Sequence, residues 1–240
     1  IVDGGAVEAG VAPDAVAQLL DAFERETDAA MTLGYSTNLV IHAFALTARS
    51  TGFGPELTRP FFASMRADLR EIEHDSKSFD LYVYGSAEVV GLMCLKAFLV
   101  GVTPTETDAA ALVHGARRLG AAFQKVNFLR DLAADYSELG RSYFPDVDVA
   151  TFTEADKVRL LDDIDADLAA SARVIPMLPA TSRRAVALAQ GLFAELSNRL
   201  RATPARELLN SRVRVPNPVK LRIAAVAASG RIPNLPKGIS

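Results

Sequence analysis

The sequence contains a single cysteine, Cys94, and no tryptophan. One cysteine excludes a framework of intramolecular disulfides and is typical of proteins from a reducing compartment. Acidic residues outnumber basic ones, 29 to 26, so no excess of positive charge indicates a nucleic-acid partner. Because no signal or transit segment is visible, we expect a cytoplasmic protein.

Long apolar runs and several common site motifs are also missing. The longest apolar run, residues 89–102, is interrupted by Lys96 and is too short to span a bilayer. The three histidines have no zinc-ligand spacing. There is no nucleophile elbow, Walker loop or dinucleotide fingerprint, so we expect no hydrolase chemistry, no nucleotide binding and no NADPH.

What the chain does contain is helical periodicity. Half of its 240 residues are hydrophobic, and Ala and Leu dominate, which favours helices. No segment alternates like a strand over a useful length. The length fits one domain with a substantial core. We therefore predict an all-α domain spanning residues 1–240, with main helices over residues 13–33, 38–49, 60–74, 79–100, 105–138, 153–175, 182–200 and 218–228.

One predicted helix carries an unusual polar stripe. At about 100° per residue, four side chains fall within an arc of roughly 80°: Gln124, Asn127, Asp131 and Asp135. Apolar residues occupy the opposite side of the helix. An exposed helix face normally carries mixed charges. Two amides and two carboxylates are instead typical of a cavity wall, although an exposed acidic face is the alternative.

Two carboxylates one helical turn apart can share a hard cation. Mg²⁺ takes one or two protein carboxylates and completes its coordination with water and substrate phosphate oxygens. The pair Asp131 and Asp135 therefore predicts a Mg²⁺ site that binds a phosphorylated substrate, with Mn²⁺ as a substitute.

Two longer motifs resemble those of the squalene/phytoene synthase family. The stripe, read as Gln124-x-x-Asn127-x-x-Arg130-Asp131-x-x-x-Asp135 and followed by Gly140-Arg141-x-Tyr143-x-Pro145, resembles the second aspartate-rich region of that family. Residues 82–93, from Tyr82 to Met93, resemble the helix that lines its substrate tunnel. The similarity extends from Ile1 to about Arg222, which is nearly the whole chain.

The resemblance implies a fold and a set of site residues. The fold is the all-α isoprenoid synthase bundle around a central cavity. Asp3 would be the last acid of the first aspartate-rich motif, whose first acid would precede Ile1, and would bind metal together with Asp131 and Asp135. Tyr82 would organise the reacting centre. The proposed substrate-binding residues are Ser86, Ala87, Gly91, Gln124, Asn127, Arg130 and Arg212. For Arg130, a structural ion pair is the alternative.

The implied reaction is the head-to-head condensation of two allylic prenyl diphosphates through a cyclopropylcarbinyl diphosphate. Phytoene from geranylgeranyl diphosphate is the first choice, and squalene or dehydrosqualene from farnesyl diphosphate is the alternative. A non-catalytic relative that serves in assembly or lipid binding is the alternative from another class. The resemblance also implies peripheral association with a membrane, and it leaves the oligomeric state open.

Two further acidic features lead to separate predictions. The cluster Asp162, Asp163, Asp165 and Asp167 lies on a helix whose apolar stripe includes Val158 and Leu161, so Asp163 and Asp167 should face water. The chain has Ala134 where the family usually carries Glu, and Glu88 where it usually carries Gly. Glu88 either supplies the acid that is missing at position 134, or it faces solvent or pairs with a surface lysine.

Overall fold

The computed structural model describes residues 2, 4–70, 74–139 and 143–233, and within that part the side chains of residues 134–139 are not considered. The described chain is helical and contains no strand, which confirms the predicted fold class. Its α-helices are α1 (Gly5–Glu8), α2 (Pro13–Leu33), α3 (Leu39–Thr51), α4 (Pro55–Ala67), α5 (Ser76–Val83), α6 (Val89–Phe98), α7 (Glu106–Leu139), α8 (Glu154–Val174), α9 (Ala180–Ala202), α10 (Ala205–Leu208) and α11 (Asn217–Ala228).

Most helices occupy the predicted ranges, and their ends follow local capping. Thr153, at the start of the predicted range 153–175, caps α8 in a capping box with Asp156. Ser78 directly precedes the predicted range 79–100 but is not the cap, because the Asp75 carboxylate accepts the Ser78 backbone N–H and α5 begins earlier. The predicted start at Pro60 is also wrong. Pro55 takes the first turn of α4, where a missing N–H costs little, and Pro60 lies inside the helix.

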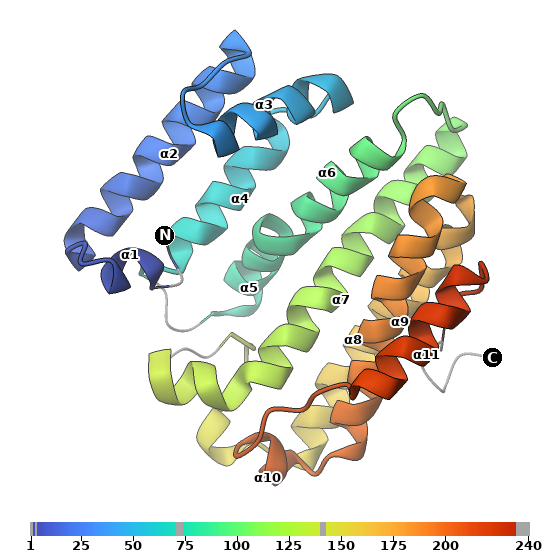
Figure 1. Cartoon of the computed structure of the whole chain (residues 1–240). Coiled ribbons are helices and arrows are strands. Elements are labelled where there is room, and N and C mark those ends of the chain that lie inside the picture. Colours follow the sequence, from blue (N-terminus) through green and yellow to red (C-terminus); the bar gives the residue numbers. More distant parts are fainter. Residues whose placement is uncertain (1, 3, 71–73, 140–142, 234–240) are drawn as a thin grey trace.

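The arrangement is a bundle built around α7. Helix α7 packs against α6, α8 and α9, while α2, α3 and α4 form a separate group that reaches α6 (Figure 1). The largest core cluster joins residues of α5, α7, α8 and α9. Because α7 has neighbours on several sides, only part of its surface is left to line a cavity.

The helix predicted over residues 79–100 contains a π-helical turn, Tyr84–Glu88, between α5 and α6. Such turns are frequent at functional sites. Glycines allow close approach to this segment. A Cβ on Gly120 would lie 2.4 Å from the Ala87 carbonyl oxygen, and a Cβ on Gly91 would lie 2.5 Å from that of Ala116. These glycines therefore set how closely α6 approaches α7.

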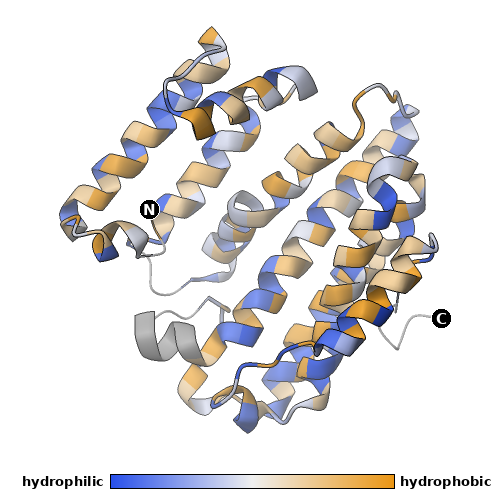
Figure 2. Cartoon of the chain, in the orientation of Figure 1, coloured by the Kyte–Doolittle hydropathy of each residue, from blue (hydrophilic) through white to orange (hydrophobic). Residues whose placement is uncertain are grey.

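The continuous helix Ser76–Phe98 is the one helix of the described chain that is long and apolar enough to cross a membrane. The sequence expectation considered only the apolar run after residue 88, and the π-helical turn joins that run to α5. In the fold this helix packs against α4 and α7. Figure 2 shows α6 coloured mainly as hydrophobic, whereas α2 alternates between the two classes. A core helix passes the same test of length and composition, so the finding is weak evidence for a membrane span.

The acidic cluster on α8 does not lie on one solvated face, as the sequence predicted. Asp163 is exposed, but Asp167 is buried at 4% exposure. The Lys125 ammonium from α7 contacts Asp163 at 2.5 Å and Asp167 at 2.8 Å. Arg118 also contacts Asp167, at 3.1 Å. Val158, placed on the buried stripe by the sequence, is 38% exposed. The packing of α8 on α7 covers Asp167 and leaves Val158 at the edge of the interface.

Candidate active site

Asp131 holds a position where three charged side chains meet. Its carboxylate pairs with Arg130, Nη2 to Oδ2 at 2.5 Å, and with Arg212, Nε to Oδ1 at 2.7 Å. Arg212 lies in the segment between α10 and α11. The side chain of Asp131 is 22% exposed, so a ligand can reach it. The structure thus brings together two proposed phosphate ligands and one proposed metal ligand, and it also forms the structural ion pair that was the alternative for Arg130.

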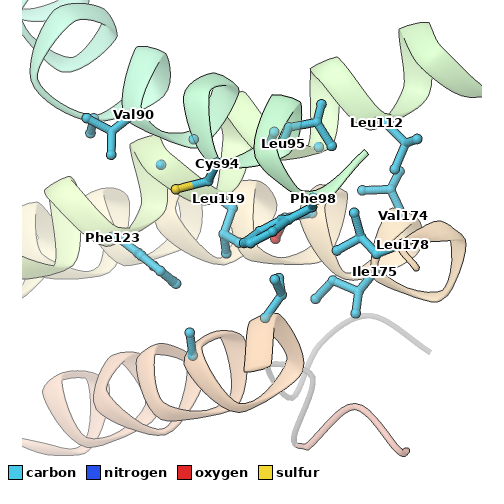
Figure 3. Close-up of a pocket in the computed structure, with 18 of the residues that line it drawn as sticks. Val90, Cys94, Leu95, Phe98, Leu112, Leu119, Phe123, Val174, Ile175 and Leu178 are labelled. Atoms are coloured by element: carbon cyan, nitrogen blue, oxygen red, sulfur yellow. The ribbon is translucent and has the colours of Figure 1, made fainter. Parts of the chain in front are cut away.

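An apolar cavity of about 440 Å³ begins at Gln124, two turns of α7 before Asp131. Four of the predicted substrate-binding residues line it: Ser86, Ala87, Gly91 and Gln124. The rest of the lining is almost entirely apolar and comes from α6, α7, α8 and α9. Figure 3 shows Phe123 towards one end and Val174, Ile175 and Leu178 towards the other. The polar stripe of α7 therefore leads into an apolar chamber through Gln124.

A second cavity, of about 530 Å³, lies beside Asp131. Its basic residues are Arg130, Arg212, Arg214 and Lys220, and its apolar wall includes Leu192, Phe193 and Leu196 of α9. Guanidinium and ammonium groups are the usual protein partners of phosphate. This cavity is therefore suited to an anion, in contrast to the first.

Tyr82 does not line either cavity. It is 5% exposed and packs among aromatic rings, with ring centroids 5.8 Å from Phe128 and 5.6 Å from Tyr143. Its hydroxyl donates a 2.7 Å hydrogen bond to Asp68. Burial, followed by the negative charge of Asp68, raises the pKa of Tyr82 far above its usual value. Tyr82 is thus a neutral hydroxyl that is fixed in the core by Asp68. The sequence interpretation missed Asp68, for which no local motif gave a signal.

The proposed metal ligands are only partly described. Asp3 and the side chain of Asp135 lie outside the described residues, and so does Arg141. Among the described side chains, no group of three or more His, Cys, Asp or Glu residues could hold a metal ion. Asp131 nevertheless offers reachable carboxylate oxygens, and Asn127 on the same stripe offers an amide oxygen. Oxygen ligands are those that Mg²⁺ prefers, so the donor types fit a hard cation.

Glu88 does not supply an acid near position 134. It is 7% exposed and its carboxylate contacts Arg117 Nε at 2.6 Å. Arg117 and Ala134 are about 25 Å apart along the axis of α7, at about 1.5 Å per residue. The solvent-facing alternative is wrong because Glu88 is buried, and the basic partner of Glu88 is the half-exposed Arg117 rather than a lysine.

Comparisons with known proteins agree with this geometry. A search of curated proteins finds no match to the chain. Among solved structures, the fold resembles squalene synthase HpnC from Alicyclobacillus acidocaldarius, with 21% identity over 80% of this chain and 74% of that one and a TM-score of 0.65.

It also resembles TcSQS in complex with the ligand BPH1237, with 15% identity over 94% of this chain and 74% of that one and a TM-score of 0.58. At these identities the likeness shows the fold. The model of the family named squalene/phytoene synthase matches residues 5–218, which is most of the sequence. This chain therefore belongs to the squalene/phytoene synthase family of head-to-head prenyltransferases.

Proposed function

We propose that this protein condenses two molecules of geranylgeranyl diphosphate head to head and forms phytoene. The observation that carries the proposal is the sequence of environments along α7. An anion pocket with four basic residues lies beside Asp131, and an apolar cavity follows it along the same helix. A prenyl diphosphate has this same order of groups, an anionic head and a long apolar tail.

The chain's own residues have separable tasks in this reaction. Arg130, Arg212, Arg214 and Lys220 bind the diphosphate and stabilise the charge it gains on leaving. The apolar lining holds the tail and excludes water from the allylic cation, which the double bond of the second substrate attacks. The carbocation formed by this attack loses a proton as the cyclopropane ring closes, which gives the cyclopropylcarbinyl diphosphate. This intermediate ionises in turn, and rearrangement with loss of a second proton completes the hydrocarbon.

Asp131, together with Asp135 and Asp3, would hold Mg²⁺. The bound ion would neutralise part of the diphosphate charge and make it a better leaving group. Asp131 pairs with Arg130 and Arg212. The same three side chains would thus bring a metal-binding carboxylate and two phosphate-binding guanidinium groups to one place.

The length of the apolar cavity supports the longer substrate. From Gln124 to Leu112 the cavity follows α7 for about 18 Å, at about 1.5 Å per residue. Each C5 unit of an extended prenyl chain covers about 5 Å, since it contains four zigzag C–C bonds of roughly 1.5 Å. Four units match this length more closely than three. A shorter tail would leave part of the lining without contacts.

Squalene or dehydrosqualene synthesis from farnesyl diphosphate is the second candidate, and one observation favours it. One of the structures that the fold resembles is named as a squalene synthase. Both candidates use the same residues at the anion pocket, and they differ in how far the tail reaches towards Leu178.

Product analysis with each substrate tests the choice. The protein is incubated with geranylgeranyl or farnesyl diphosphate and Mg²⁺, and the extracted hydrocarbons are identified by mass spectrometry. We expect a C40 product with kcat/KM at least about tenfold above that for the C15 substrate. A reversed ratio would assign the farnesyl reaction. Absence of both turnover and Mg²⁺-dependent diphosphate binding would favour the non-catalytic relative.

A further inference from the structure

The two cavities lie end to end in the groove between α7 and α9. Along α7, the apolar cavity is lined as far as Gln124 and the basic pocket begins at Arg130. Along α9, the apolar cavity is lined as far as Ala189 and the basic pocket begins at Leu192. The two cavities have no lining residue in common. The boundary between them therefore crosses the groove at the same level on both helices.

A stacked aromatic pair occupies this boundary. Phe123 of α7 lines the apolar cavity, and Phe193 of α9 lines the basic pocket. Their ring centroids are 3.8 Å apart and the rings are nearly parallel, with an interplanar angle of 16°. Figure 3 shows the Phe123 side chain at the end of the cavity remote from Leu178.

We propose that Phe123 and Phe193 form an aromatic gate between the anion pocket and the apolar cavity. The inference rests on the proposed function for the kind of ligand: a chain with its diphosphate beside Arg212 and its tail in the apolar cavity must pass between α7 and α9 where these rings meet. The rings separate to admit the tail and then flank its first carbons.

The chemistry of the pair suits a barrier to water. Neither ring has a polar atom, so a water molecule of the basic pocket finds no hydrogen-bond partner at the boundary. The attraction within a stacked pair is modest compared with the burial of a long apolar tail, so a ligand can open it. In the closed state the gate slows the entry of a tail, and around a bound tail it keeps water away from the reacting carbons.

The gate can be tested by binding kinetics without turnover. The probe is geranylgeranyl thiolodiphosphate, whose C–S bond resists ionisation and which spans both cavities. Inorganic diphosphate serves as a probe of the basic pocket alone. The test variant is Phe193→Ala, and the matched control is Leu188→Ala, which also shortens an apolar side chain of α9 but lines neither cavity. Circular dichroism first establishes that both variants keep the helicity of the parent.

We expect the association rate constant of the thiolodiphosphate to rise about tenfold in Phe193→Ala, because association no longer waits for a conformational change. Inorganic diphosphate should bind all three proteins with the same affinity within about twofold, and Leu188→Ala should bind the thiolodiphosphate at the parental rate. Phe193→Leu, used if the alanine variant loses helicity, should give an intermediate rise. An unchanged association rate in the Phe193 variants, or an equal rise in Leu188→Ala, would overturn the gate.

A second readout uses the products. When water reaches the allylic cation, its oxygen bonds to the cationic carbon and the released proton passes to the departed diphosphate, which gives a prenyl alcohol. The alcohol share of the products should rise in Phe193→Ala and rise less in Phe193→Leu, which keeps a larger apolar side chain at the boundary. An alcohol share that stays at the parental level in Phe193→Ala would contradict the barrier to water. If no prenyl diphosphate is turned over but the association rates behave as expected, the proposed function fails and the gate stands.

Discussion

Two aspartates on α8 contact the same lysine but differ in burial, and this difference predicts unequal effects on stability. Lys125 contacts both Asp163 and Asp167. The side chain of Asp163 is 60% exposed, whereas that of Asp167 is 5% exposed and also contacts Arg118. The matched substitutions Asp163→Asn and Asp167→Asn remove the same charge from the two environments.

Substitution of the buried Asp167 should lower the free energy of unfolding more than substitution of Asp163. Removing one partner of a fully buried ion pair costs about 3–5 kcal/mol, because the remaining charge is left uncompensated. The loss is reduced here because Lys125 keeps Asp163, and because Arg118 is 38% exposed and can turn to water. We therefore expect Asp167→Asn to lower the free energy of unfolding by about 2 kcal/mol. For the exposed Asp163 we expect a loss below about 1 kcal/mol.

Urea unfolding at pH 7, monitored by circular dichroism, measures the free energy of unfolding of both variants. The two losses can be compared if the m-values are equal.

The pH dependence supplies a second test. Burial alone lowers the pKa of Lys125, but attraction to Asp167 and hydrogen bonds to both aspartates outweigh it, so the pKa lies above its usual value of 10.5. A raised lysine pKa stabilises the fold below the unfolded pKa, and this contribution is lost as the pH rises through the folded pKa.

The difference between the parent and Asp167→Asn should consequently shrink as the pH rises above about 10.5. Equal losses for the two substitutions at pH 7 would refute the reasoning, since Asp167 differs from Asp163 in its burial against α7 and in its contact with Arg118. A larger loss for Asp163→Asn would do the same.

Three further predictions concern the groove and its packing. Asp131→Asn should lower turnover at least about hundredfold with little change in melting temperature, because the position is partly exposed and its charge acts on the substrate. A loss of turnover that is accompanied by a large fall in melting temperature would indicate a structural role instead. Gly120→Ala should destabilise the protein by more than about 2 kcal/mol in urea unfolding, since the new Cβ would meet the Ala87 carbonyl oxygen at 2.4 Å and backbone cannot yield as a side chain can. Glu88→Gly should lower the free energy of unfolding. Adding Ala134→Glu should not restore turnover, because Glu88 is paired with Arg117, which lies about 25 Å from Ala134 along α7. Restored turnover would contradict the assignment of Glu88 to the ion pair with Arg117.

The sequence alone determined the features that lie within one helix. The spacing of Gln124, Asn127 and Asp131 needed only the 3.6-residue repeat of an α-helix, and α7 occupies nearly the predicted range. The resemblance to a known family, together with the small residues Ser86 and Gly91, indicated part of the cavity wall. Both residues line the observed cavity. Capping by Thr153 was predictable because it involves a neighbour three residues away.

The tertiary structure decided what depends on a second helix. Periodicity separates an apolar face from a polar one, but it does not tell which polar residue a neighbouring helix will cover, so Asp167 was assigned to water while α7 buries it beside Lys125. The same reason explains the Phe123–Phe193 stack, whose members are 70 positions apart in the sequence and meet only because α9 packs along α7. Local patterns report the faces of single helices, whereas ion pairs, cavities and gates form between helices, where packing fixes which faces meet.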